Sequence, residues 1–306
     1  MKQLSVIAFP GAPNLPLFAA MEHGFFAEAG LDIRFETTPS SVYQFEQFGT
    51  GAFDIAFTAF DNVVAYAEGQ GAAKLPTKPD FRAVMGCTQL ALSFVVSPDI
   101  KTVDDVRGKS LALDAVSTGF AFVLYDMLAR CGVQKGEYQV APVGSTPERW
   151  RSVKEGQHSG TISIEPFTSI ARANGFPTLL KSGDFFPTYQ GGVIAVRQDW
   201  AEANDEALVA FLAVYRRGLA WVLDPANREA AAAILAARMP EIQPKALEAV
   251  MVSLLSPDSG LTPDGAVLRE GARAVLDLRS RYGSGSEPLT DVDRYFDLRW
   301  MERVPA

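Results

Sequence analysis

The chain has 306 residues, about twice the ~150 residues of an ordinary domain, so we expect one large domain or two lobes. Hydrophobic residues make up 48% and charged residues 21%, which is typical of folded globular proteins and excludes wholesale disorder. The 36 acidic and 28 basic side chains give a formal net charge of −8, which argues against nucleic acids and anionic membranes as partners.

Neither cysteine has the neighbours that a metal site or a disulfide framework needs. Cys87 and Cys131 are isolated, without a Cys-x-x-Cys motif or a nearby pair of histidines. No stretch reaches the ~18 uninterrupted apolar residues of a membrane helix. A short apolar run near the N-terminus ends at Pro10, before it reaches the length of a signal peptide. We therefore expect no metal site, and an export signal that was either removed or never present.

The first part of the chain predicts alternating strands and helices. Residues 4–9 form a short apolar, β-prone run that ends at a Pro-Gly-Ala-Pro turn, and residues 15–23 have helical composition with Asn14 as N-cap. The later elements of this unit are a strand at residues 31–35, a helix that ends near residue 49 and a strand at residues 53–57. This order predicts a βαβαβ unit with parallel strands.

The same order of elements recurs about 105 residues later in the chain. Its expected elements are strands at residues 110–114, 138–143 and 160–164, with helices at residues 120–130 and 148–154. Two βαβαβ units predict two α/β lobes, and chance recurrence of a common pattern is the alternative. Between and after them, further strands are expected at residues 81–86, 92–96 and 191–196.

The pattern from residue 199 onward is helical. Residues at helical spacing predict one apolar face on a long helix: Leu208, Phe211, Leu212, Tyr215, Leu219 and Val222. Further helices are expected between the breaks at Pro225, Pro240, Pro257 and Pro263. Residues 283–286 read as a flexible link to a last short helix at residues 290–301.

Catalytic motifs are missing from the sequence. The only histidines are His23, at the end of the first predicted helix, and His158, in a polar loop, so a nucleophile with a neighbouring base is not indicated. No phosphate-binding loop, nucleophile elbow or zinc-protease motif occurs. Paired carboxylates remain open as acid/base groups, but no pair stands out.

Polar turns follow the predicted strands of both units. They comprise residues 13–14, 38–41, 58–62, 117–119 and 145–146. In an open parallel sheet, such turns lie at the carboxyl ends of the strands, where helix N-termini direct free N–H groups at a ligand. For any single turn, N-capping is an equal explanation. For five turns together, the sequence predicts a ligand cleft shared by two lobes.

Several segments in a fixed order carry a family resemblance. They are LPLFAAMEHGFFAEAGLDI at residues 15–33, GTGAFDIA at 49–56, VDDVRGK at 103–109, the Glu165-Pro166 pair and the helical region 200–222. In these segments the chain resembles the ABC-transporter substrate-binding proteins of the sulfonate, nitrate, taurine and pyrimidine-precursor group, the NMT1/THI5-like family.

The resemblance implies a two-lobed periplasmic-binding-protein fold of type II, with two hinge crossings and a ligand cleft between the lobes. Lobe one would combine residues 1–90 and 191–306, lobe two would be residues 91–190, and the hinges would lie near 87–92 and 190–192. Such proteins close around a ligand, because a ligand that contacts both lobes favours the closed state. The closed form is presented to an ABC permease and its ATPase, so a monomer without cofactor or catalysis is expected.

The resemblance also implies most of a set of ligand-binding residues. Ser145 and Thr146 join the set because they form a polar turn, and Tyr189 joins it as a ring that could stack on a ligand. The set is Gly11, Asn14, Ser40, Ser41, Thr58, Asp61, Ser117, Thr118, Gly119, Ser145, Thr146, Glu165 and Tyr189. Helix N-terminal donors favour a sulfonate, carboxylate or phosphate oxygen. The acidic members favour instead an amino group on a pyrimidine-like ring.

Larger side chains near these turns are further candidates. Rings that could stack on a ligand are Phe9, Tyr43, Phe60, Phe120 and Tyr189, although core packing explains such residues equally well. Arg149 and Trp150 are the best cationic and indole candidates.

Two other functions remain open. One is a cofactor-biosynthesis enzyme of the thiamine-pyrimidine or menaquinone type on the same fold, and the other is a ligand-sensing module that regulates a partner. The protein would be periplasmic or extracytoplasmic if a signal peptide was removed, and cytoplasmic if Met1 is the native start.

Overall fold

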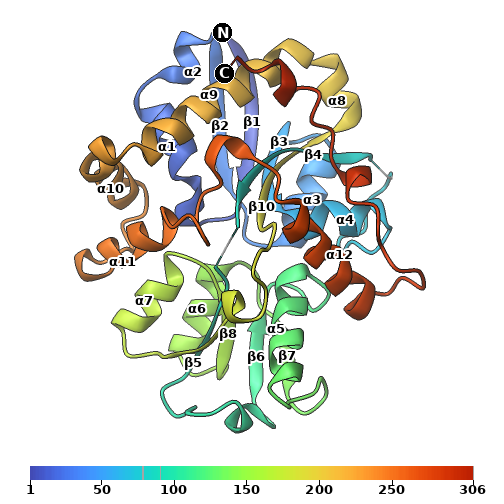
Figure 1. The fold of residues 1–306 in the computed structure, drawn as a ribbon, viewed down its shortest axis with the longest axis vertical. Helices are drawn as coiled ribbons and strands as arrows, with labels where there is room; N and C mark the ends of the chain where they lie inside the picture. The colour runs from blue at the N-terminus through green and yellow to red at the C-terminus, as the bar shows by residue number, and fades with distance from the viewer. Residues whose placement is uncertain (78, 90, 306) are drawn as a thin grey trace.

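The computed structural model describes residues 1–77, 79–89 and 91–305. It contains two five-stranded sheets, one in an upper lobe and one in a lower lobe (Figure 1). The upper sheet has the order β2-β1-β3-β10-β4. Its strands are β1 (Lys2–Ala8), β2 (Leu31–Thr37), β3 (Ile55–Ala59), β4 (Phe81–Thr88) and β10 (Gly192–Arg197). Strand β1 is parallel to β2 and β3, and β10 is antiparallel to both of its neighbours.

The lower sheet repeats this arrangement with the order β7-β6-β8-β5-β9. Its strands are β5 (Ser93–Val96), β6 (Ser110–Leu113), β7 (Gln139–Pro142), β8 (Gly160–Ser163) and β9 (Thr178–Lys181). Strand β6 is parallel to β7 and β8, and β5 is antiparallel to β8 and β9. Each sheet therefore combines a βαβαβ unit with one strand, β10 or β5, that is antiparallel to its neighbours, which confirms the predicted fold class.

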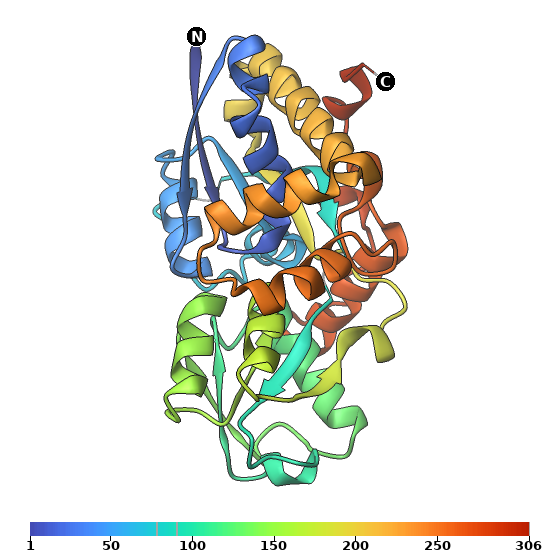
Figure 2. The ribbon, with the colours of Figure 1, turned by 90° about the vertical axis from the view of Figure 1, so that its left-hand side faces the viewer.

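Most helices belong to the upper lobe (Figures 1 and 2). They are α1 (Leu15–Glu22), α2 (Phe25–Glu28), α3 (Ser41–Gly49), α4 (Phe60–Ala67), α8 (Gln198–Ala203), α9 (Asp205–Leu223), α10 (Arg228–Arg238), α11 (Pro244–Leu254) and α12 (Arg269–Tyr282). The lower lobe contains α5 (Gly119–Arg130), α6 (Thr146–Lys154) and α7 (Phe167–Ala173). None of the helices in the described part of the chain combines the length and the hydropathy that a membrane crossing requires.

The long helix α9 packs its predicted apolar face into the core. All six residues of that face are buried, and the helix runs along α1 in the upper lobe. Full burial of one large aliphatic or aromatic side chain contributes about 1.5–3 kcal/mol, so this face contributes substantially to the stability of the upper lobe.

The chain passes between the lobes from β4 to β5 and returns from β9 to β10. Residues 259–262 run beside the first crossing: Thr262 N donates to Cys87 O (2.8 Å), and Ala91 N donates to Ser259 O (3.2 Å). The predicted lobe limits and hinges stay predictions, and residue 90 lies outside the described residues.

One local prediction is wrong. Residues 290–301 form no α-helix but two 3₁₀ turns, Asp293–Tyr295 and Met301–Arg303. This segment lies along the upper sheet instead, where Asp297 N donates to Ala83 O (2.9 Å). Asn14 occupies the N-cap position of α1, as predicted, but its side chain makes no capping hydrogen bond; its Nδ2 donates to Phe9 O (2.8 Å).

Candidate functional site

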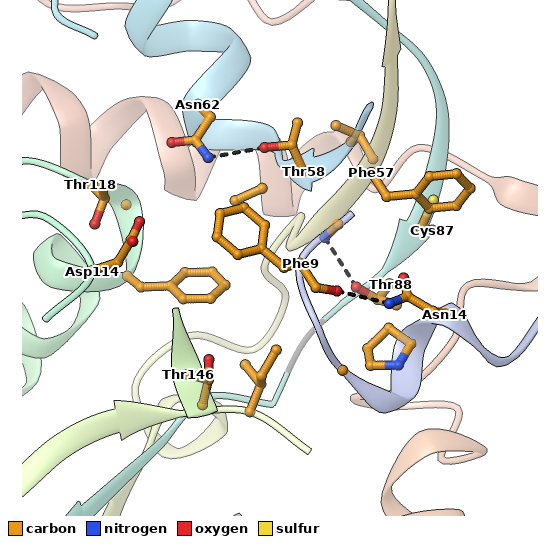
Figure 3. Close-up of a pocket in the computed structure, with 18 of the residues that line it drawn as sticks. Phe9, Asn14, Phe57, Thr58, Asn62, Cys87, Thr88, Asp114, Thr118 and Thr146 are labelled. Atoms are coloured by element: carbon orange, nitrogen blue, oxygen red, sulfur yellow. Dashed lines mark hydrogen bonds between the residues drawn. The ribbon is translucent and has the colours of Figure 1, made fainter. Parts of the chain in front are cut away.

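A cavity of about 90 Å³ lies between the two lobes (Figure 3). The upper lobe contributes Phe9, Gly11, Pro13, Asn14, Phe57, Thr58, Ala59, Asn62, Cys87, Thr88, Gly192 and Val193. The lower lobe contributes Asp114, Thr118, Gly119, Phe120, Thr146, Arg149 and Ile164. Many of these residues follow the ends of strands in the two βαβαβ units, which is where open parallel sheets place their ligands.

Three buried threonines supply hydroxyl groups to the cavity. The hydroxyl oxygens of Thr58, Thr88 and Thr146 each accept one hydrogen bond, from Asn62 Nδ2, Gly192 N and Arg149 Nη2 respectively, all at 3.0 Å. Within the described residues, none of these hydroxyls donates to a protein acceptor. Because none of the three hydroxyls donates within that part of the chain, each hydroxyl proton is free for an acceptor atom on a ligand.

Arg149 is the cationic member of the lining and is 2% exposed. Helix α6 carries it toward β8. Its Nε donates to Thr161 Oγ1 (3.1 Å), and Nη1 donates to Gly144 O (2.8 Å). Nη2 donates to Thr146 Oγ1 (3.0 Å) and to Ile162 O (3.1 Å). Burial lowers the pKa of Arg149 to about 10, so its guanidinium remains charged at neutral pH.

Asp114 is the acidic member of the lining and connects the two lobes. It follows β6, and both of its carboxylate oxygens accept from Ser41 N at 3.1 Å. Ser41 begins α3, whose N-terminus is capped by Ser40 Oγ accepting from Tyr43 N (3.1 Å). The positive end of the helix dipole therefore stabilises the Asp114 carboxylate.

Apolar side chains form much of the remaining wall, including Phe9, Phe57, Phe120, Ile164 and Val193. Figure 3 shows Phe9 between two polar sides of the cavity, with Asp114 and Thr118 on one side and Asn14 and Thr88 on the other. The cavity therefore suits a small ligand that combines polar atoms with an apolar body.

The lobes also contact each other around this cavity. Lys245 Nζ of α11 donates to the O of Ala173, the last residue of α7 (2.7 Å), and Tyr282 Oη of α12 donates to Asp126 Oδ1 of α5 (3.1 Å). Gly119 lies so close to α4 that a Cβ atom built on it would be 2.5 Å from Asp61 Cβ. The lobes are therefore closed against each other in this structure.

Six of the predicted site residues line the cavity: Gly11, Asn14, Thr58, Thr118, Gly119 and Thr146. Seven lie outside its lining: Ser40, Ser41, Asp61, Ser117, Ser145, Glu165 and Tyr189. Of the further candidates, Phe9, Phe120 and Arg149 line it, whereas Trp150 packs against Phe176 with ring centroids 4.9 Å apart.

Asp61 is engaged by a buried arginine. Arg279 of α12 donates to both carboxylate oxygens, at 2.7 and 2.6 Å, and both side chains are 1% exposed. Arg279 Nη2 also donates to Ser117 O of the lower lobe (3.1 Å). The Glu165 carboxylate accepts from Ser169 N and Ser169 Oγ, and burial raises its pKa.

Lining residues that were not predicted as site residues include Phe57, Asn62, Thr88 and Asp114. Asp114 is the last residue of a predicted strand and Asn62 belongs to a polar turn, so both could have been predicted as site residues from their positions. Thr88 enters the site because β4 and β10 lie side by side at the crossing, which local patterning does not show.

Cys87 lines the cavity, but its environment makes the thiol unreactive. Burial raises its pKa to about 12, so the nucleophilic thiolate is scarce at neutral pH. We expect a maleimide to modify exposed Cys131 quickly and Cys87 only after unfolding. Mass spectrometry of the labelled protein, with Cys131→Ser as control, measures this difference. Fast labelling of the folded Cys131→Ser protein would contradict the expectation.

Solved structures with the same fold come from several binding proteins. The periplasmic nitrate-binding protein NrtA from Synechocystis PCC 6803 has a TM-score of 0.82 at 15% identity, covering 99% of this chain and 88% of its own. The alkanesulfonate-binding protein SsuA from Xanthomonas axonopodis pv. citri, bound to MOPS, has 0.73 at 17% identity, covering 92% and 93%.

An enzyme shares the fold as well. The desulfurization enzyme DSZB has a TM-score of 0.66 at 13% identity, covering 99% of both chains. A search of curated protein sequences finds no match. The model of the NMT1-like family matches residues 2–236, and the chain therefore belongs to the NMT1-like family.

Proposed function

We propose that this protein is the solute-binding component of an ABC importer and captures a small polar or anionic organic molecule between its lobes. The observation that carries the proposal is the cavity, whose polar groups come from both lobes. A ligand that contacts both lobes binds the closed form more tightly and shifts the population toward it. The closed form is then the species that a permease and its ATPase recognise.

The functions of two proteins with similar structures support this role. NrtA is a nitrate-binding protein and SsuA is an alkanesulfonate-binding protein, and both share the fold of this chain. In this role the protein would be a monomer located outside the cytoplasm, where it collects solute for the importer.

The proposed role is binding without catalysis. Cys87 is the thiol in the lining, and its raised pKa makes it a poor nucleophile. Neither His23 nor His158 belongs to the lining as the structure describes it. His158 Nδ1 instead lies 3.2 Å from Ser152 Oγ, and His23 packs on Trp221. A histidine base beside a reactive thiol is therefore not part of this cavity as the structure describes it.

A thermal-shift screen tests the proposal. The purified protein is heated with sulfonates, nitrate, carboxylates, amino-pyrimidines and phosphonates, and hits are examined by small-angle scattering. At 100 times its dissociation constant, a ligand stabilises the folded state by about 2.7 kcal/mol, which raises the melting temperature by several degrees.

Chemical analysis of the released ligand separates binding from catalysis. Recovery of the unchanged compound, together with compaction of the protein, supports the solute-binding role. Recovery of a product would identify an enzyme instead, and binding without compaction would contradict closure around the ligand.

A further inference from the structure

The two charged side chains of the cavity lining are balanced differently. Asp114 accepts two hydrogen bonds from Ser41 N at the positive end of the nine-residue helix α3. Arg149 has only neutral oxygen atoms as hydrogen-bond partners. No carboxylate lies within 4.0 Å of its guanidinium in residues 1–77, 79–89 and 91–305. Asp114 and Glu148 act on the charge of Arg149 only from beyond this distance. The positive charge of the lining therefore has no directly bonded counterion.

Arg149 also retains hydrogen-bonding capacity. A guanidinium has five N–H donors, and the four bonds of Arg149 leave one N–H of Nη1 without an acceptor in the described structure. The hydroxyl of Thr146 accepts from Arg149, so its proton is directed elsewhere. These two neighbouring donors match the oxygen atoms of a carboxylate or sulfonate group.

We propose that Arg149 and Thr146 bind the acidic group of the ligand and that Asp114 limits this ligand to a single negative charge. This inference rests on the proposed solute-binding function. The ligand class is a small organic monoanion, whose apolar body lies against Phe9 and Phe120. A second negative charge would share the cavity with the Asp114 carboxylate, and repulsion between like charges is strong in a site that excludes water.

Two pairs of probes that match in shape isolate the effect of charge. Benzoate is compared with neutral benzamide, and benzenesulfonate is compared with phenylphosphonate in mildly alkaline buffer, where the phosphonate carries two negative charges. We expect each monoanion to bind at least about tenfold more tightly than its partner in isothermal titration calorimetry.

Two variants assign the effect to residues. Thr146→Val keeps the shape of the side chain and removes the hydroxyl, so benzoate should bind about tenfold more weakly. Asp114→Asn removes the negative charge, so the preference for benzenesulfonate over phenylphosphonate should fall about tenfold. The control is Thr168→Val in α7, because Thr168 is a buried threonine outside the lining whose hydroxyl has no partner in the described residues. This control should not change binding.

Each outcome has one consequence. Three results would overturn the assignment of Arg149 and Thr146. They are equal affinities for benzoate and benzamide, equal effects of Thr146→Val and Thr168→Val on benzoate binding, and no binding of any of the four probes. A preference that persists in Asp114→Asn overturns the role of Asp114. The proposed function fails separately, when no compound of any charge in the wider screen binds or compacts the protein.

Discussion

Asp61→Asn is expected to destabilise the protein by about 3–5 kcal/mol without any ligand present. The substitution leaves the guanidinium of Arg279 buried without a counterion, since both side chains of this pair are 1% exposed. The cost of an unpaired buried charge exceeds the loss of two ordinary hydrogen bonds. Urea unfolding followed by circular dichroism measures the change in the free energy of unfolding.

An exposed ion pair provides the matched control for Asp61. Arg269 and Asp293 also pair, but their side chains are 55% and 69% exposed, so Asp293→Asn should change stability very little. Replacing both buried partners, Asp61→Leu with Arg279→Met, should recover much of the stability, because apolar residues of similar volume need no counterion. Equal losses in Asp61→Asn and Asp293→Asn would show that the buried pair is unimportant.

Gly119→Ala is expected to weaken ligand binding about 10- to 100-fold while the protein stays folded. The new methyl group would lie 2.5 Å from Asp61 Cβ, which belongs to the other lobe. Such overpacking costs about 1–3 kcal/mol, and the lobes can relieve it by staying apart, so the cost falls on the closed state. Titration calorimetry with a ligand from the screen measures the affinity.

Gly183→Ala is the control for Gly119→Ala. Gly183 is exposed, and a Cβ atom built on it meets no atom within 4 Å in the described structure, so affinity should not change. Small-angle scattering with the ligand should show less compaction for Gly119→Ala than for Gly183→Ala. Wild-type affinity in Gly119→Ala would mean that closure does not bring α5 against α4.

The strand and helix order was predictable because each element has a local signal. Alternating apolar residues mark the strands, Gly and Pro mark the turns, and the apolar face of α9 repeats at helical spacing. The segment at residues 290–301 failed because its structure depends on pairing with Ala83, far away in the sequence. Propensity carries no information on such a partner, and tertiary contacts override it.

Part of the site was predictable for the same reason. Thr58, Thr118 and Thr146 follow predicted strands, and the fold brings the ends of those strands together. The role of Asp61 could not be read locally, since its partner Arg279 is 218 positions away. An acidic residue in a polar turn looks the same in the sequence whether it faces a ligand or a buried arginine.

The hydrogen bonds at the first crossing determine where the lower lobe can rotate. Ala91 N is bonded to Ser259 O of the upper lobe, whereas Leu92 and Ser182 exchange hydrogen bonds within the lower lobe. We therefore expect the predicted hinge to lie near the peptide unit between Ala91 and Leu92. On the return path, Phe186 N is still bonded to Ser182 O, and Gly191 N is already bonded to Thr88 O.

Between these two bonds, the return path has several residues whose backbone dihedral angles can change when the lobes move. At the first crossing, Ala91 and Leu92 are bonded to different lobes and are adjacent in the chain. We expect the lower lobe to rotate about an axis that passes near the peptide between Ala91 and Leu92. Such a rotation would separate Asp114 from Ser41 and break the hydrogen bonds that join the lobes there.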